Sequence, residues 1–440
     1  MLLVIVALVL PRWVLLILWI PILMALSFSN LFPPLFSVAD VDIYSFDIVL
    51  SIVALRTCIA IGLGRQPLYF HNVYRIIAIY LSVLLAATIW SLFRFGEEVF
   101  IGEIKPFLRL LAQMSVVFWM AEAVRWHHRS ARVWRSVRYL GYVLAASIYL
   151  NIFLIPWGMQ FGEVQVSKGI VRYFAILGDQ VGFVLIYFIY RELITNNLLG
   201  ATVLGGALTL TGTRGALIAL VVGFAILILR RRWIFVCNYA HRMWTLFVFP
   251  VILGILAMLD LGGMKSRFLI PEILASGVGQ RMFTMGTAAQ VFADNLITGV
   301  GYTGFRYLAL DYDAMEIAME KLGGFSPSFI ATANNQYLQV GTDGGIFALV
   351  FFVLMVVIFM RALRWAVMHT SGEERAGFAA AYLYMFSLAL GNWFAAWVLP
   401  GSLITYFVCI LVGLAVGCQL RVEKAKKIAH LGISMVHQEG

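Results

Sequence analysis

Charged and amide side chains stand where long apolar segments of this chain begin. In "TLTGTRGALIAL", residues 209–220, Arg214 lies between two apolar runs and is flanked by glycines. An arginine in such a setting is costly unless it faces water, a partner or an anionic ligand. Its planar guanidinium fits phosphate oxygens, so anion binding is one interpretation. The other is an arginine at a helix end whose long side chain reaches water.

A second stretch, "SKGIVRYFAILGDQVGFVL" at residues 167–185, holds Arg172 and Asp179 near the start of an apolar run. We expect Gly178 to form a turn before the helix resumes, because glycine adopts turn conformations at little steric cost. Asp179 has two interpretations that the residues leave open. Aspartate is a preferred helix cap, and its carboxylate can also accept a proton from a hydroxyl group.

A third stretch, "ANNQYLQVGTDGGIFALV" at residues 333–350, places four consecutive polar residues directly before a membrane-length apolar run. An asparagine amide can position a hydroxyl group but cannot take its proton at neutral pH. The simpler interpretation is that these residues cap the helix. Asp343 lies within the same run, and an acid inside a membrane helix normally faces the bundle interior or a cavity.

The elements that must position these residues are membrane helices. The 440 residues are 62% hydrophobic and 12% charged, with a mean hydropathy of +0.92, which is far outside the soluble globular range. We interpret residues 1–28 as a retained first span, because they lack a charged n-region and a small-residue cleavage site. The four cysteines fall in predicted spans or in a basic loop and indicate neither a disulfide nor catalysis.

About twelve segments approach the length of about 20 apolar residues that a helix needs to cross the hydrocarbon. The predicted fold class is therefore all-α, a polytopic membrane helix bundle formed as a single integral membrane domain over residues 1–440. The predicted spans lie near residues 12–30, 46–63, 76–93, 107–124, 139–156, 175–190, 197–210, 215–229, 244–260, 335–360, 377–396 and 401–420.

The distribution of basic residues sets the expected topology. With the N-terminus in the cytoplasm, 19 of the 32 Lys and Arg residues fall in cytoplasmic connections, 10 fall on the opposite side and the rest lie within spans. This bias favours both termini in the cytoplasm. Residues 421–440 then form a basic cytoplasmic tail facing anionic lipid, so the net charge of +10 calls for no nucleic-acid partner.

The same topology makes residues 261–333 one large extracytoplasmic loop between the ninth and tenth spans, far longer than a usual connector and therefore a functional candidate. Apolar residues after Arg281 recur at helical spacing, so we expect Arg281 to open an amphipathic helix. That helix should end before the glycine-rich "LITGVGYTGF" at residues 296–305. This turn is not a P-loop because it lacks the Gly-Lys-Ser/Thr ending, although amides near glycines can bind an anion.

Taken in order, three segments carry a resemblance: "TGTRGALIAL", the loop with "GQR...AAQVFADNLITGVGYTGF", and "NNQYLQVGTDGGIFALV". Together they resemble the O-antigen ligase and O-antigen polymerase superfamily of bacterial envelopes. The resemblance covers roughly residues 172–357, and the N-terminal spans resemble the family only in hydropathy. The order of the three segments is specific, whereas each alone is weak.

The resemblance implies a glycosyltransferase of the bacterial inner membrane whose active site faces the periplasm. It would move a glycan from an undecaprenyl diphosphate carrier to an acceptor hydroxyl on a lipid or glycan, with no metal ion or other cofactor. Arg214 and Arg281, joined by Arg172, would bind the donor diphosphate and stabilise charge on the leaving group. The residues implied to bind acceptor or sugar hydroxyls are Asn335, Gln336 and Tyr337. Envelope polysaccharide assembly proteins are further expected partners.

One position departs from the family pattern. Ligases of this family usually have a histidine, assigned as general base, where this chain has Asn334, and all seven histidines fall in connections expected to be cytoplasmic. We include Asn334 in the catalytic set as a residue that positions the acceptor hydroxyl, and favour Asp179 as base because it lies at a span mouth. The outer carboxylates that could serve as base are Asp179, Glu163, Asp294, Asp311, Asp313, Glu316 and Glu320.

A base is not strictly required for this chemistry. In a dissociative transition state, arginines on the diphosphate would supply most of the stabilisation and the proton could leave late to water. The missing histidine therefore favours a polymerase or a divergent exopolysaccharide enzyme over a standard lipid A core ligase.

Two other classes of function remain open. A transporter or flippase of an anionic lipid or solute would use the same arginines without a base, although it does not explain the long loop, and the sequence shows no paired broken helices. A non-catalytic scaffold for an envelope assembly complex would also fit if both Arg214 and Arg281 proved dispensable.

Overall fold

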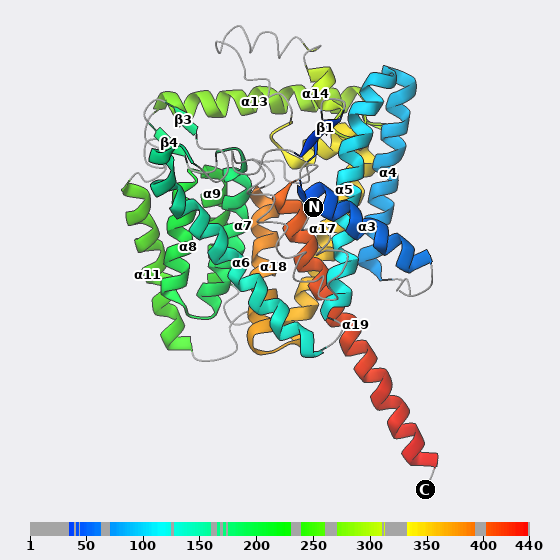
Figure 1. Cartoon of the computed structure of the whole chain (residues 1–440), viewed down its shortest axis with the longest axis vertical. Coiled ribbons are helices and arrows are strands. Elements are labelled where there is room, and N and C mark those ends of the chain that lie inside the picture. The colour runs from blue at the N-terminus through cyan, green and yellow to red at the C-terminus, as the bar shows by residue number, and fades with distance from the viewer. Residues whose placement is uncertain are drawn as a thin grey trace.

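The computed structural model describes most of the chain and is almost entirely helical (Figure 1). The described residues are 35–38, 41–43, 45–62, 71–124, 127–159, 165–167, 170–172, 175–229, 239–259, 271–309, 312, 332–391 and 402–438. The helices are α3 (Ser45–Gly62), α4 (Asn72–Phe95), α5 (Glu97–Val124), α6 (His127–Leu154), the 3-10 turn η1 (Ile155–Trp157), α7 (Ala175–Ile194), α8 (Leu198–Leu210), α9 (Arg214–Leu229), α11 (Tyr239–Met258), α13 (Pro271–Asp294), α14 (Phe305–Leu308), α17 (Gln336–His369), α18 (Gly372–Gly391) and α19 (Leu403–Gln438).

Two short antiparallel hairpins accompany the helices. Strand β1 (Phe36–Val38) pairs with β2 (Val41–Ile43), and β3 (Gln165–Ser167) pairs with β4 (Ile170–Arg172). Each strand has three residues, so the hairpins add to the predicted helical class without changing it.

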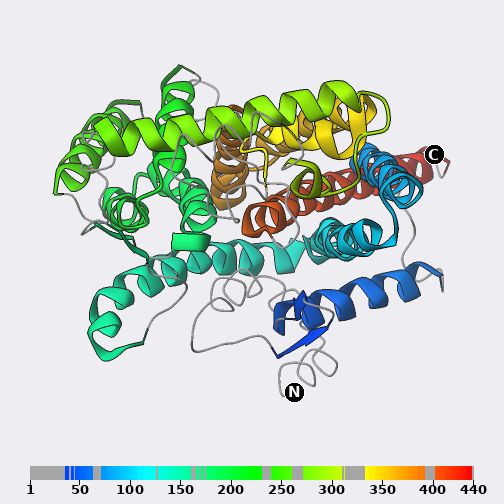
Figure 2. The ribbon, with the colours of Figure 1, turned by 90° about the horizontal axis from the view of Figure 1, so that it is seen from above.

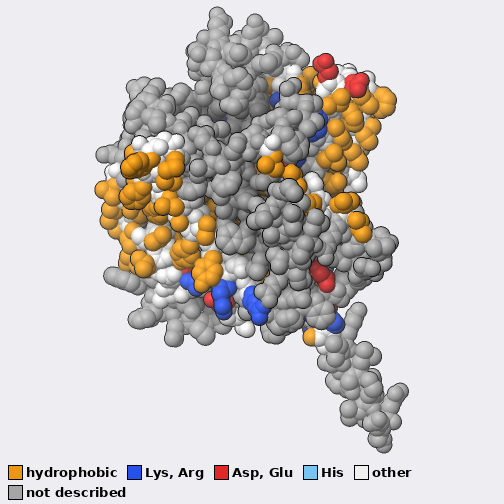
Figure 3. Space-filling model, in the orientation of Figure 1, with side chains coloured by type: hydrophobic (Ala, Val, Ile, Leu, Met, Phe, Trp, Pro, Cys, Tyr) orange, Lys and Arg blue, Asp and Glu red, His pale blue; other side chains and the backbone are white. Residues whose placement is uncertain are grey.

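Within the described ranges, five helical segments are long and apolar enough to cross a membrane: Asn72–Phe95, Glu97–Glu122, Arg132–Trp157, Gln336–His369 and Leu403–Lys426. The predicted multi-pass bundle is confirmed at this level, while the number of twelve spans stays a prediction. The second to twelfth predicted spans each coincide with a described helix, and the first lies outside the described residues. Figure 3 shows patches of exposed hydrophobic side chains on the left and the right of the bundle, as expected for a surface in contact with lipid.

Helix α19 lies at the centre of the bundle. In its most apolar window 94% of residues are buried, against less than half in each of the other four spans, so protein rather than lipid surrounds it. Its Gly413 and Gly417 allow close packing on α5. A Cβ at these glycines would lie only 2.6 Å from Val117 O and 2.3 Å from Ala121 O. Small residues permit this kind of close helix approach in membranes.

Helix α17 is broken near its start. Gly344 and Gly345 leave the helical conformation, and Gly345 has φ +69° and ψ −167°, a region that essentially only glycine occupies. The break is stabilised from outside the helix, because Ile346 N donates to Leu296 O over 2.7 Å. The loop after α13 is therefore bonded directly into the interrupted helix.

Helix α13 lies across one end of the bundle, as Figures 1 and 2 show in two views. It begins at Pro271, so the prediction that Arg281 opens this helix is wrong and Arg281 lies in its middle. Proline is favoured at the first helical position, whereas the apolar periodicity starts only later. The prediction of a turn at Gly178 is also wrong, because α7 already begins at Ala175 and contains Gly178 and Asp179.

Candidate functional site

The start of α17 is fixed by Asn335, the helix cap. Asn335 has extended backbone angles, and its Oδ1 accepts hydrogen bonds from Tyr337 N at 2.9 Å and Leu338 N at 3.1 Å. The side chain is buried. The cap interpretation is thus confirmed for Asn335, whose amide oxygen is engaged by the helix it starts.

Asn334 connects the approach to α17 with α13. Its φ is +54°, a conformation that asparagine tolerates better than most residues. Its Nδ2 donates to Thr284 Oγ1 over 3.1 Å and to Thr332 O over 3.4 Å. Thr284 in turn donates from its hydroxyl to Arg281 O over 3.0 Å. Asn334 is therefore hydrogen-bonded to the helical turn that carries Arg281.

The polar side chains that follow Asn335 in the chain contact other parts of the protein. Gln336 is fully buried, and the Tyr337 hydroxyl donates to Ala389 O of α18 over 2.7 Å. Gln339 accepts from Ala333 N over 2.8 Å and donates from Nε2 to Asp343 Oδ1 over 2.9 Å. Asp343 is only 2% exposed, as expected for an acid facing the bundle interior.

Arg214 begins α9 at the turn that joins it to α8, and it is partly buried. The threonines before it are buried and bonded to each other, with 3.0 Å between Thr211 Oγ1 and Thr213 Oγ1. A Cβ at Gly182 of α7 would lie 3.2 Å from both threonine side chains. Asp179 precedes Gly182 by about one helical turn, so its backbone lies near the start of α9.

A chain of contacts links the start of α9 to the start of α17. The Phe183 ring packs against Gly215 of α9 and Gly391 of α18. Two residues before Gly391, Ala389 O accepts the hydrogen bond from Tyr337 of α17. Arg214, Arg281 and Asn334 thus belong to one continuous region at the end of the bundle that α13 crosses. Arg172 ends β4 opposite Gln165 of β3, and Asp179 lies near the start of α7.

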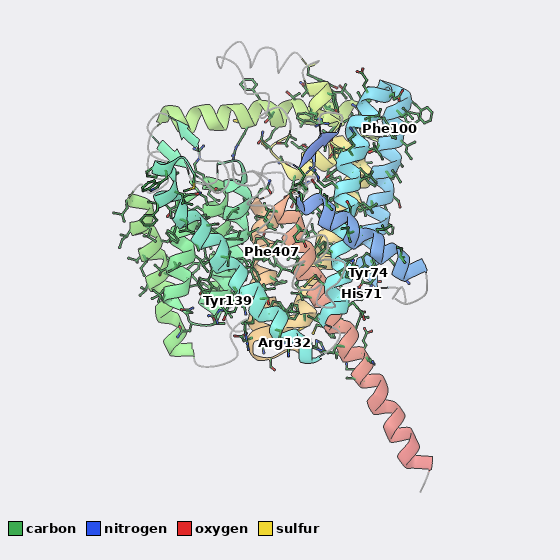
Figure 4. All side chains as sticks on the ribbon, in the orientation of Figure 1. His71, Tyr74, Phe100, Arg132, Tyr139 and Phe407 are labelled. Atoms are coloured by element: carbon green, nitrogen blue, oxygen red, sulfur yellow. The ribbon has the colours of Figure 1, made fainter. Side chains whose placement is uncertain are left out.

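Two histidines lie at the opposite end of the bundle. His71 precedes α4 and contacts Gln419 of α19 through its Nε2, and His369 is the last residue of the long helix α17. In the view of Figure 4, Phe100, near the start of α5, lies well above His71. Neither His71 nor His369 can reach the Asn334 region.

The sequence analysis missed Glu103 as a buried acid. It was placed in a connection between two spans, but α5 starts at Glu97 and the Glu103 side chain is 0% exposed. Its distances along the chain to Phe107, Leu110 and Met114, which are also buried, follow one helical face. Extending that apolar face backward would have placed Glu103 on it. The described residues hold no group of three His, Cys, Asp or Glu side chains that could bind a metal ion.

Part of the region described above matches a known protein family. Residues 199–353 match the O-antigen ligase family model. The match confirms the resemblance, and this O-antigen ligase domain runs from α8 to α17. It includes Arg214, Arg281 and the segment from Asn334 to Tyr337. The match supports an O-antigen ligase-like or polymerase-like membrane glycosyltransferase. A comparison with curated proteins found none that matches the chain.

Proposed function

We propose that this protein is a periplasm-facing glycosyltransferase that moves a glycan from an undecaprenyl diphosphate carrier to an acceptor hydroxyl. The observation that carries the proposal is the Asn334–Thr284–Arg281 connection, which joins two of the implied site segments within the O-antigen ligase domain. In this proposal both termini lie in the cytoplasm and α13 covers the periplasmic end of the site.

The arginines would act on the leaving group. The bond between the anomeric carbon and the diphosphate oxygen breaks, the acceptor oxygen bonds to that carbon, and the undecaprenyl diphosphate leaves with the negative charge. Arg214, Arg281 and Arg172 would stabilise that charge as it develops. The acceptor proton goes to Asp179 or, in a dissociative reaction, to water.

Asn334 would position the acceptor rather than deprotonate it. Its Nδ2 is engaged by Thr284 and Thr332, whereas its Oδ1 can accept a hydrogen bond from an acceptor hydroxyl. Gln336 and Tyr337 would support this position from within α17. The absence of a base at Asn334 is our reason for favouring a polymerase over a ligase.

The test is glycan profiling of a deletion strain complemented with wild type, Arg214→Ala, Arg281→Ala and Asn334→His. Single repeat units accumulating in the deletion and in both arginine variants support a polymerase, and long chains stranded on the lipid carrier support a ligase. Arg306→Gln is the matched control, because the Arg306 guanidinium is exposed and bonds to Gly102 O outside this site. Normal glycan in both Arg214→Ala and Arg281→Ala would refute diphosphate binding by these residues.

A transporter of an anionic lipid or solute is the second candidate, because α17 is interrupted at Gly344 and Gly345. Broken helices near the middle of a membrane commonly form binding sites in transporters. Substrate accumulation in proteoliposomes, with no change in glycan chain length, would favour this candidate over the enzyme.

A further inference from the structure

Two buried carboxyl groups lie against the turn formed by residues 301–304, with sequence Gly-Tyr-Thr-Gly, that follows α13. One belongs to Glu103 of α5 and the other to Asp343 of α17. We propose that both are positioning residues that clamp this turn and so hold α13 over the site, and that Glu103 acts as the neutral carboxylic acid. The role assigned to α13 rests on the proposed function, because α13 carries Arg281.

The backbone amides of the turn are bonded to its surroundings. Gly301 N donates to Asp343 O over 3.0 Å, and Tyr302 N donates to Thr88 Oγ1 of α4 over 3.1 Å. The Thr303 backbone amide bonds to the carboxyl group of Asp343, and Gly304 N donates to Gly301 O over 2.9 Å. Helices α4 and α17 therefore hold the turn through its main chain.

Glu103 fills the space that side chains at the glycines would need. Gly301 has φ +95°, and a Cβ there would lie 1.9 Å from Glu103 Oε2. A Cβ at Gly304 would lie 2.7 Å from Glu103 Oε1. The carboxyl group is thus pressed directly against the turn, and both glycines are required for that contact.

The hydrogen bonds around Glu103 fit a neutral acid. Ser91 Oγ lies 2.6 Å from Glu103 Oε2 and 2.8 Å from Thr88 O, but a serine hydroxyl carries a single hydrogen. If Glu103 Oε2 carries a proton, it donates to Ser91 Oγ, and Ser91 donates to Thr88 O, so both short contacts are satisfied. Glu103 Oε1 is buried with no hydrogen-bond donor among the residues that the structure describes, which is far less costly for a neutral carbonyl oxygen than for a carboxylate.

The charges around Glu103 and Asp343 also favour a neutral carboxylic acid. Among the described residues, no Lys or Arg lies within ion-pair distance of Glu103 or Asp343, and the cation that faces Glu103 from α14 at longer range is Arg306. Arg306 instead bonds to Gly102 O. Two ionised carboxylates beside one another without a cation would repel, so one neutral member is the stable arrangement.

The clamp continues into α13. Val300 N donates to Thr342 O over 2.8 Å, and Arg94 of α4 donates to Asn295 just after α13 ends. Helix α13 packs on the residues that flank the turn, since buried Ala288 belongs to one cluster with Val300 and Phe305. Breaking the contacts that hold the turn should therefore make α13 separate from the bundle more often.

The test measures how often α13 opens, without any glycan. Ala288→Cys is placed in a chain whose native cysteines are replaced by alanine, and its labelling by a water-soluble maleimide is followed in detergent. We expect Glu103→Ala to raise the labelling rate about tenfold, as loss of a buried polar contact allows, and Glu103→Gln to leave it within about twofold of the parent, because a neutral amide replaces the neutral acid. Ser91→Ala, which keeps the acid but removes its partner, should also raise labelling.

The possible results distinguish between the clamp, the neutral state of Glu103 and the proposed function. Unchanged labelling in both Glu103→Ala and Ser91→Ala would overturn the clamp. Labelling that rises equally in Glu103→Gln and in Arg306→Gln would show that Glu103 acts as an anion and overturn the neutral acid. Glycan profiling of Glu103→Ala should reproduce the defect of Arg281→Ala. If labelling rises as expected while Arg281→Ala makes normal glycan, the clamp stands and the proposed function fails.

Discussion

The side-chain amide of Asn334 donates a hydrogen bond to the hydroxyl of Thr284, joining the approach to α17 with the middle of α13 over 3.1 Å. The two residues are fifty positions apart in the chain, and Thr284 passes the connection on to Arg281 O. Asn334, at the position where the resemblance leads us to expect a catalytic base, therefore also connects the approach to α17 with α13. We call this Asn334–Thr284 hydrogen bond the tie. Replacing Asn334 should therefore affect the contact with α13 as well as the proposed positioning of the acceptor hydroxyl.

The tie can be measured by a double-mutant cycle. Asn334→Gly keeps the backbone at φ +54° and removes the amide, while Thr284→Val removes the hydroxyl and keeps the shape. We expect a coupling free energy of about 1 kcal/mol between the two changes, measured from thermal unfolding in detergent. The matched control is Thr287→Val, because the buried Thr287 hydroxyl has no hydrogen-bond partner in the described part of the chain and its removal should be neutral. Additive effects of the two changes would contradict the tie.

Substitutions at two asparagine helix caps distinguish a loss of stability from a loss of function. Asn335 caps α17 within the O-antigen ligase domain, and Asn197 caps α8 with its oxygen accepting from Gly200 N over 3.1 Å. Each change to alanine should cost about 1 kcal/mol of stability. Only Asn335→Ala should impair glycan assembly in the complemented strain, since Asn197 lies at the other end of α8 from Arg214. Equal glycan defects at equal stability would argue against a site at the start of α17.

The sequence was sufficient for the helices because span signals are local. A run of about 20 apolar residues predicts a membrane span by itself. The helices near residues 76–93 and 335–360 could therefore be predicted without knowing which other helices pack against them. The helix starts were less accurate. Gly178 and the residues before Arg281 look like breaks in an apolar pattern, yet α7 and α13 continue through them.

The clamp could not be predicted because it depends on contacts between distant segments. Glu103 is buried by a turn about two hundred residues later in the chain, and the bond from Asn334 to Thr284 bridges separate helices. Residue types alone marked Asp343 as unusual, since it interrupts an apolar run. They did not mark Glu103, which falls between Glu98 and Lys105 in a connection between two predicted spans.

The break in α17 should tolerate no side chain at Gly345. Its φ of +69° is unfavourable for alanine, and a Cβ would lie 2.4 Å from Ile297 O. We expect Gly345→Ala to lower the stability by at least about 2 kcal/mol. The control Gly286→Ala lies within α13 with nothing near its Cβ position and should be neutral or stabilising by up to about 1 kcal/mol. A melting temperature for Gly345→Ala at or above that of Gly286→Ala would show that the break is not a fixed feature.

His71 should make the opposite end of the bundle sensitive to acid. Burial lowers the pKa of His71 below its usual value, against the opposing effects of its hydrogen bond to Gln419 and of Glu423. The neutral ring accepts from Val73 N through Nδ1, so protonation would also remove the cap of α4.

A lowered pKa in the folded state means that the unfolded chain binds the proton first. The stabilising contribution of His71 is therefore complete above the unfolded pKa of about 6.5 and is lost as the pH falls through that value. We expect the melting temperature to fall between about pH 8 and pH 5.5 more steeply in wild type than in His71→Asn, which keeps a capping side chain and does not titrate. Parallel pH profiles of the two proteins would show that His71 titrates alike in the folded and unfolded states.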